Sequence, residues 1–192
     1  MDYLVLGLLL FLGVHSLRLF ADGWRARTIA RIGAMPWKGL YSLASLAGLG
    51  LIVWGFGLAR AQPEALWSPP LAMRHLASLL TLIAFVLLSV AYVPGNRIRA
   101  RLHHPMVLGV KVWALAHLLA NGNLAHLLLF GSVLLWAALD FRSARRRDRA
   151  NQTVYPPGRS GPTLLAVGVG LVAWALFAFV LHGLLIGVKP IG

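Results

Sequence analysis

The sequence contains no cysteine and only five acidic residues among its 192 residues. Without cysteine, the chain cannot form disulfides, iron–sulfur clusters or thiolate-ligated metal sites. It also lacks a Ser-His-Asp set, a phosphate-binding glycine loop and a pair of carboxylates, so nothing supports a hydrolase or a nucleotide-triphosphate enzyme.

Charge of either sign is also scarce: charged residues make up 12% of the chain, and hydrophobic residues make up 59%. A soluble domain carries roughly a quarter charged residues. The composition therefore predicts an all-α integral membrane bundle. No polar stretch is long enough for a second core, so residues 1–192 form one domain. The first apolar run lacks a basic leader and a small-residue cleavage site, so it is expected to stay as a membrane helix.

The charge that is present is basic, with a formal net charge of +13. Most cations lie in short loops beside apolar runs, where they fix membrane topology and contact anionic lipid. No basic surface interleaved with aromatic residues exists outside those loops, so membrane lipid is the expected partner and nucleic acid is not.

Six apolar runs predict six transmembrane helices, over residues 3–20, 39–59, 72–92, 106–120, 124–140 and 163–187. The fourth and fifth are separated only by Asn121-Gly122-Asn123, which predicts a short helical hairpin. In the second helix, small residues permit close helix packing; they are Gly48, Gly50, Gly55 and Gly57.

The cation distribution supports this partition. With six helices, loops 21–38, 93–105 and 141–161 share one side and carry four, three and six cations, whereas the opposite side carries Arg60, Arg74 and Lys189. The positive-inside rule places the basic loops inside and both termini outside. A single helix over 106–140 would destroy this asymmetry, and it would be far longer than the roughly 20 residues that span a bilayer.

Two of the seven histidines, His15 and His117, fall inside apolar runs, where an imidazole is costly and therefore suggests a functional site. Counted from the helix ends, their depths are similar. Two imidazoles at one depth in a bundle suit a bis-histidine haem. The alternative is that each imidazole hydrogen-bonds a neighbouring helix.

Other polar residues are less specific. Lys111 lies below His117 on the same run and is expected to snorkel or to meet an anionic group such as a propionate. Arg18 lies one turn beyond His15 on the same helix face. An outer metal site remains an alternative if three outer histidines meet in the bundle; they are His75, His126 and His182.

Several motifs resemble the NnrU family over nearly the whole chain. They are His15-Ser16, Lys38-Gly39-Leu40-Tyr41-Ser42, Val93-Pro94-Gly95-Asn96-Arg97, and His104-Pro105-Met106 with Gly109 and Trp113-Ala114-Leu115-Ala116-His117. The resemblance implies a bacterial inner-membrane protein, multi-pass with periplasmic termini, that is connected with denitrification through nitrite and nitric oxide metabolism. Denitrification reductases or a redox partner are the implied protein partners.

The same domain occurs in plant 15-cis-zeta-carotene isomerase, a haem b enzyme. By this resemblance, His15 and His117 are the axial ligands of haem b, with Lys111 and Arg18 as propionate or second-sphere partners. That isomerase has a cysteine where this chain has Ala114. A ligand switch to thiolate is therefore not available here, which weighs against carotenoid isomerisation.

Two other functions stay open. The segment from His103 to Gly109 looks like part of the isoprenylcysteine-type membrane methyltransferases, which hold S-adenosylmethionine with a later glutamate pair; here that region reads Arg145-Arg146-Arg147-Asp148. The other is a non-catalytic scaffold or assembly factor for denitrification enzymes, with the glycine-rich helix and basic loops as its partner surfaces.

Overall fold

The computed structural model describes residues 1–191, and within that range it is helical, with no β-strand. The elements in chain order are α1 (Asp2–His15), α2 (Leu17–Phe20), α3 (Asp22–Ile32), α4 (Ala34–Ala61), α5 (Leu71–Tyr92), α6 (Arg97–Leu102), α7 (Pro105–Ala120), α8 (Leu124–Ala150), α9 (Ser160–Leu176), a π-helical turn η1 (Phe177–Leu181) and α10 (His182–Ile186). The predicted all-α class is confirmed.

Four helical segments are long and apolar enough to cross a membrane: α4, α5, α8 and the continuous run Ser160–Ile186. The chain is therefore a membrane protein. The apolar helices α1 and α7 are shorter, at 14 and 16 residues. Because a straight crossing needs roughly 20 residues, the count of six crossings stays a prediction.

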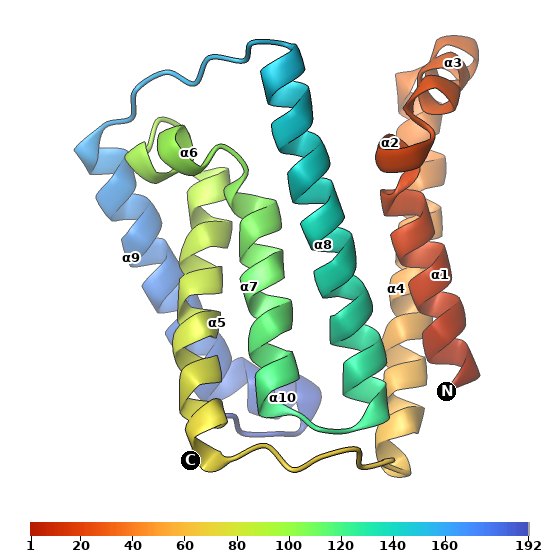
Figure 1. Cartoon of the computed structure of the whole chain (residues 1–192), viewed down its shortest axis with the longest axis vertical. Coiled ribbons are helices and arrows are strands. Elements are labelled where there is room, and N and C mark those ends of the chain that lie inside the picture. Colours follow the sequence, from red (N-terminus) through yellow and green to blue (C-terminus); the bar gives the residue numbers. More distant parts are fainter. Residues whose placement is uncertain (192) are drawn as a thin grey trace.

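The helices form two groups joined by α8 (Figure 1). In one group α1 packs along α4; in the other α5 packs against both α7 and α9. Helix α8 packs on α7 and also touches α1 and α4, so it stands between the groups. The end of the bundle with α3, α6 and the α8–α9 connection is called the basic end below; both chain termini lie at the opposite end (Figure 1).

Glycines set the spacing between these helices. A Cβ atom on Gly55 would lie 2.3 Å from the Leu4 nitrogen, and one on Gly48 would lie 2.8 Å from the Phe11 nitrogen. Gly50 and Gly57 have nothing within 4 Å of an added Cβ. The predicted close packing of the second helix is thus confirmed for two of its four glycines, and its partner is α1.

The predicted helix boundaries agree within three residues except at three ends. Helix α1 ends at His15, and Ser16 separates it from α2, so the run 3–20 is interrupted. Helix α4 begins five residues before the predicted position 39, at Ala34, and α8 continues ten residues past the predicted position 140, to Ala150. The basic loops contain the helices α3 and α6, which were not predicted because these segments are polar. The last apolar run contains the π-helical turn, which has no sequence signature.

The predicted hairpin between α7 and α8 is present, and the loop before α5 closes it. The Gly122 carbonyl accepts hydrogen bonds from the backbone nitrogens of Leu66 and Trp67, at 2.8 and 3.0 Å. A Cβ atom on Gly122 would lie 1.9 Å from the Trp67 carbonyl oxygen. The backbone of Trp67 thus fastens the end of α7.

Candidate functional site

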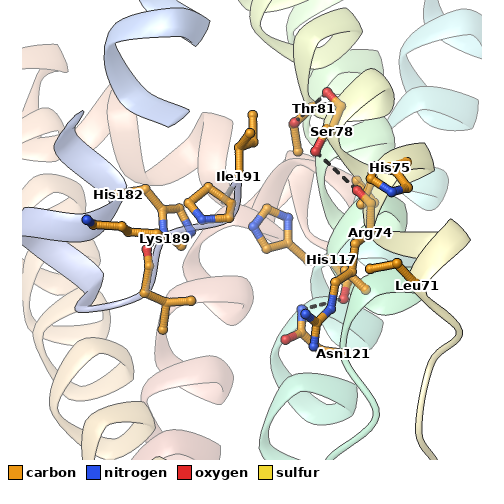
Figure 2. A pocket seen from close by; sticks show the side chains of 15 residues that line it. Leu71, Arg74, His75, Ser78, Thr81, His117, Asn121, His182, Lys189 and Ile191 are labelled. Atoms are coloured by element: carbon orange, nitrogen blue, oxygen red, sulfur yellow. Dashed lines mark hydrogen bonds between the residues drawn. The ribbon is translucent and has the colours of Figure 1, made fainter. Parts of the chain in front are cut away.

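A pocket opens at the end opposite the basic end, between α5, α7, α10 and the C-terminal residues (Figure 2). Its volume is about 390 Å³, within the range of roughly 300–1,000 Å³ that is usual for ligand sites. The polar side chains that line it are Arg74, His75, Ser78, Thr81, His117, Asn121, His182 and Lys189. Three imidazoles and two permanent cations therefore share one cavity.

His117 lies in the last turn of α7, and its ring is positioned from both sides. Its Nδ1 lies 2.9 Å from the Trp113 carbonyl oxygen, one helical turn earlier. Its ring stacks on Phe130 of α8, with the centroids 4.4 Å apart. Because a carbonyl only accepts hydrogen bonds, Nδ1 carries the proton. The lone pair of a neutral ring is then on Nε2, the arrangement of a metal-binding histidine.

His182 reaches the same pocket from α10. Its Nδ1 lies 2.6 Å from the Val188 carbonyl oxygen, which again leaves the lone pair on Nε2. Figure 2 shows His182 and His117 projecting toward the cavity from opposite sides. Depth counting identified His117 as a candidate but treated His182 as an interfacial residue.

His15 lies elsewhere, in an aromatic cluster between α1, α4 and α8. Its ring centroid is 4.2 Å from that of Phe11, 5.3 Å from Tyr41 and 5.9 Å from Trp136. Its Nδ1 is 2.7 Å from the Phe11 carbonyl oxygen. As at His117, this bond places the proton on Nδ1 and the lone pair on Nε2, but His15 is not among the residues that line the pocket.

The structure does not bring His15 and His117 to one site. Helices α1 and α7, both described in full, do not pack together, because α8 stands between them. His117 packs on Phe130 of α8 and His15 on Trp136, six residues further along. Six residues correspond to about 9 Å of rise and place the two contacts about 120° apart around α8. The equal depth of the two imidazoles stays a prediction.

The two predicted propionate partners also lie outside the pocket. The Lys111 ammonium lies 5.3 Å from the centroid of the Phe141 ring, on α8. Arg18 lies on the exposed surface of α2, beyond His15. The cations that do line the pocket are Arg74 and Lys189.

The outer three-histidine metal site is not formed. His126 packs between Phe56 and Phe130, at 5.0 and 5.9 Å between ring centroids, while His75 and His182 line the pocket. Over residues 1–191, no group of three or more histidine, aspartate or glutamate side chains is arranged to hold a metal ion.

A second polar cluster lies at the basic end, and the sequence analysis missed it. His104 Nε2 lies 2.7 Å from a carboxylate oxygen of Asp148, which also accepts a hydrogen bond of 3.0 Å from the Tyr155 hydroxyl. His103 stacks on Tyr155 with a centroid separation of 4.0 Å and contacts Arg145. This network fastens the α6–α7 turn to the end of α8, so the segment from His103 has a structural role.

The fold is a bundle of apolar helices long enough to cross a membrane, and histidine and cationic side chains line a pocket at one end of it. The model of the NnrU family, described as NnrU protein, matches residues 3–190. The chain belongs to the NnrU family. No curated protein and no solved structure matches the chain.

Proposed function

We propose that this protein binds haem b in the bacterial inner membrane, where it serves redox or sensing steps of nitrite and nitric oxide metabolism. The role in nitrite and nitric oxide metabolism is supported by membership of a family that is associated with denitrification. The observation that carries the proposal of haem binding is His117, whose Nδ1 is bonded to a backbone carbonyl and whose side chain lines the pocket at one end of the bundle.

The pocket residues fit this group. His117 would hold the iron, and Arg74 and Lys189 would lie against propionate carboxylates. Leu71, Ala77 and Ala116 supply apolar parts of the pocket wall. Haem b held in this way supplies an iron for one-electron transfer or for binding a diatomic gas. The pair His15 and His117 does not fit, since the two rings lie on different sides of α8.

The positive-inside rule orients the site. The basic end carries the arginine-rich segments and is placed at the cytoplasmic face. The pocket and both termini then lie toward the periplasm, the side from which a small nitrogen oxide would enter.

The visible spectrum of the detergent-purified protein, oxidised and then reduced with dithionite, tests the proposal. We expect a Soret band that His117→Ala abolishes or shifts. His126→Ala is the matched control, because His126 is an imidazole on the neighbouring helix whose ring also packs on Phe130 but does not line the pocket. A colourless wild-type protein, even from cells grown with added haem, would refute the proposal. It would favour a scaffold function, which co-purification of a reductase would then support.

A further inference from the structure

The C-terminal helix aims an imidazole at His117. Immediately before His182, residues Phe177–Leu181 form a π-helical turn within a run that is otherwise α-helical. A π turn inserts one residue, which rotates all that follows by about 100° relative to an uninterrupted α-helix. Without it, His182 would leave the helix in another direction, and π turns of this kind are frequent at functional sites.

Two hydrogen bonds and a glycine turn hold the segment that carries His182. The Val188 carbonyl oxygen bonds its Nδ1, which requires the chain to fold back after α10. Gly187 makes that reversal with φ of 76°, a conformation that glycine adopts without strain. Arg60 of α4 donates a hydrogen bond of 2.9 Å to the Ile186 carbonyl oxygen. The ring is thus fixed from its own tail and from a distant helix.

We infer that His182, and not His15, is the second protein ligand of the group held by His117. The inference rests on the proposed function and specifies its coordination. His117 and His182 both carry Nδ1 hydrogen-bonded to a backbone carbonyl, and both line one cavity from opposite sides. Arg74 and Lys189, which line the same cavity, provide the charge to pair with the carboxylates of an anionic tetrapyrrole.

The test compares methionine substitutions at the two competing positions. Methionine ligates haem iron and raises its midpoint potential relative to histidine. We expect His182→Met to keep haem and to shift the midpoint potential to a higher value, whereas His15→Met leaves the potential and the spectrum unchanged. A higher potential in His15→Met together with a wild-type potential in His182→Met would overturn the inference.

A second variant distinguishes the loss of an iron ligand from misfolding. His182→Ala should convert the low-spin, six-coordinate spectrum to a high-spin one, and added imidazole should restore the low-spin form by occupying the vacated place. A variant that only misfolds would not be rescued, and a low-spin His182→Ala protein without imidazole would overturn the inference.

The outcomes separate the two claims. A coloured wild-type protein that loses its haem in His117→Ala and is unaffected by every His182 variant sustains the proposed function and refutes the inference. A wild-type protein without haem refutes both.

Discussion

The packing of α1 on α4 gives the most direct test of the fold, because two glycines on the same helix should respond in opposite ways. On Gly55, an added Cβ would lie 2.3 Å from the Leu4 nitrogen and 2.7 Å from the Tyr3 carbonyl carbon. On Gly57 it would meet nothing within 4 Å. Both glycines are helical, so intrinsic helix propensity favours alanine equally at each, by about 1 kcal/mol.

The steric term decides the difference. Normal carbon contacts lie at about 3.5 Å or more, so Gly55→Ala must push α1 away by about 1 Å, and the obstructing atoms are backbone and cannot rotate aside. Overpacking of this kind costs about 1–3 kcal/mol. We therefore expect Gly57→Ala to raise the free energy of unfolding by up to about 1 kcal/mol. Gly55→Ala gains the same helix propensity but pays the steric cost, so the two variants should differ by about 1–3 kcal/mol, with Gly55→Ala the less stable.

Unfolding by dodecyl sulfate in mixed micelles, followed by tryptophan fluorescence, measures this difference. Trp54 stacks on Tyr3 across the seam, with ring centroids 4.5 Å apart, so its emission reports on the separation of α1 from α4. Equal stabilities for the two variants, or a more stable Gly55→Ala protein, would refute the close approach. Neither variant should alter the haem spectrum, because α1 contributes nothing to the pocket.

Three further predictions concern the ends of the bundle. Gly122→Ala should lower both stability and haem content, measured by unfolding and by the Soret band, because its Cβ would collide with the Trp67 carbonyl oxygen at the end of α7. Asn96→Ala should lower the free energy of unfolding by about 1–3 kcal/mol in the same assay, since the buried amide caps α6 and donates to the Val90 carbonyl. A loss below about 0.5 kcal/mol, which is the usual scatter of surface substitutions, would contradict this. Burial and the hydrogen bond to Asp148 raise the pKa of Tyr155 above its ordinary value, so the phenol stays protonated to higher pH and its stabilising bond is lost only as pH rises through that raised pKa. Subtracting the phenolate absorbance of Tyr155→Phe from that of the wild type isolates the titration of Tyr155. This titration should occur at higher pH than the one measured in the same way with Asp148→Asn present in both proteins. The same titration pH with and without Asp148→Asn would contradict the hydrogen bond.

The helical class and the long apolar segments could be predicted because lipid requires each spanning segment to satisfy its own backbone hydrogen bonds. Composition and run length therefore located α5 and the final run within three residues, whereas α4 begins five residues earlier and α8 ends ten residues later than predicted. The Asn121-Gly122-Asn123 break was predictable for the same reason, since it interrupts an apolar run that would be too long for one crossing. These local signals do not show which helices are neighbours in the bundle. The sequence therefore left open whether α1 adjoins α7.

Of the two histidines proposed as ligands, the sequence identified His117 and not its partner. His117 could be found because an imidazole deep in an apolar run is costly. Its pairing with His15 depended on α1 lying beside α7, and the two helices do not pack together because α8 stands between them. His182 was named only as one of three outer histidines, because its direction toward His117 depends on a π turn that has no sequence signature.

The cations at the end opposite the basic loops provide an independent argument for the pocket. The positive-inside rule accounts for arginines at the basic end and predicts their depletion at the other, where the sequence nonetheless retains Arg60, Arg74 and Lys189. Two of these line the pocket, and the third, Arg60, holds the carbonyl of Ile186 in the helix that carries His182. If these cations served topology or lipid contact, they would be dispersed around the rim of the bundle. Arg74 and Lys189 share one cavity with three imidazoles, and this supports the proposal that the cavity binds an anionic ligand. Replacing Arg74 and Lys189 together by glutamine should therefore lower haem retention through repeated detergent washes while leaving the unfolding transition of the haem-free protein unchanged. Equal retention in the wild-type and doubly substituted proteins would show that the two cations do not bind the ligand.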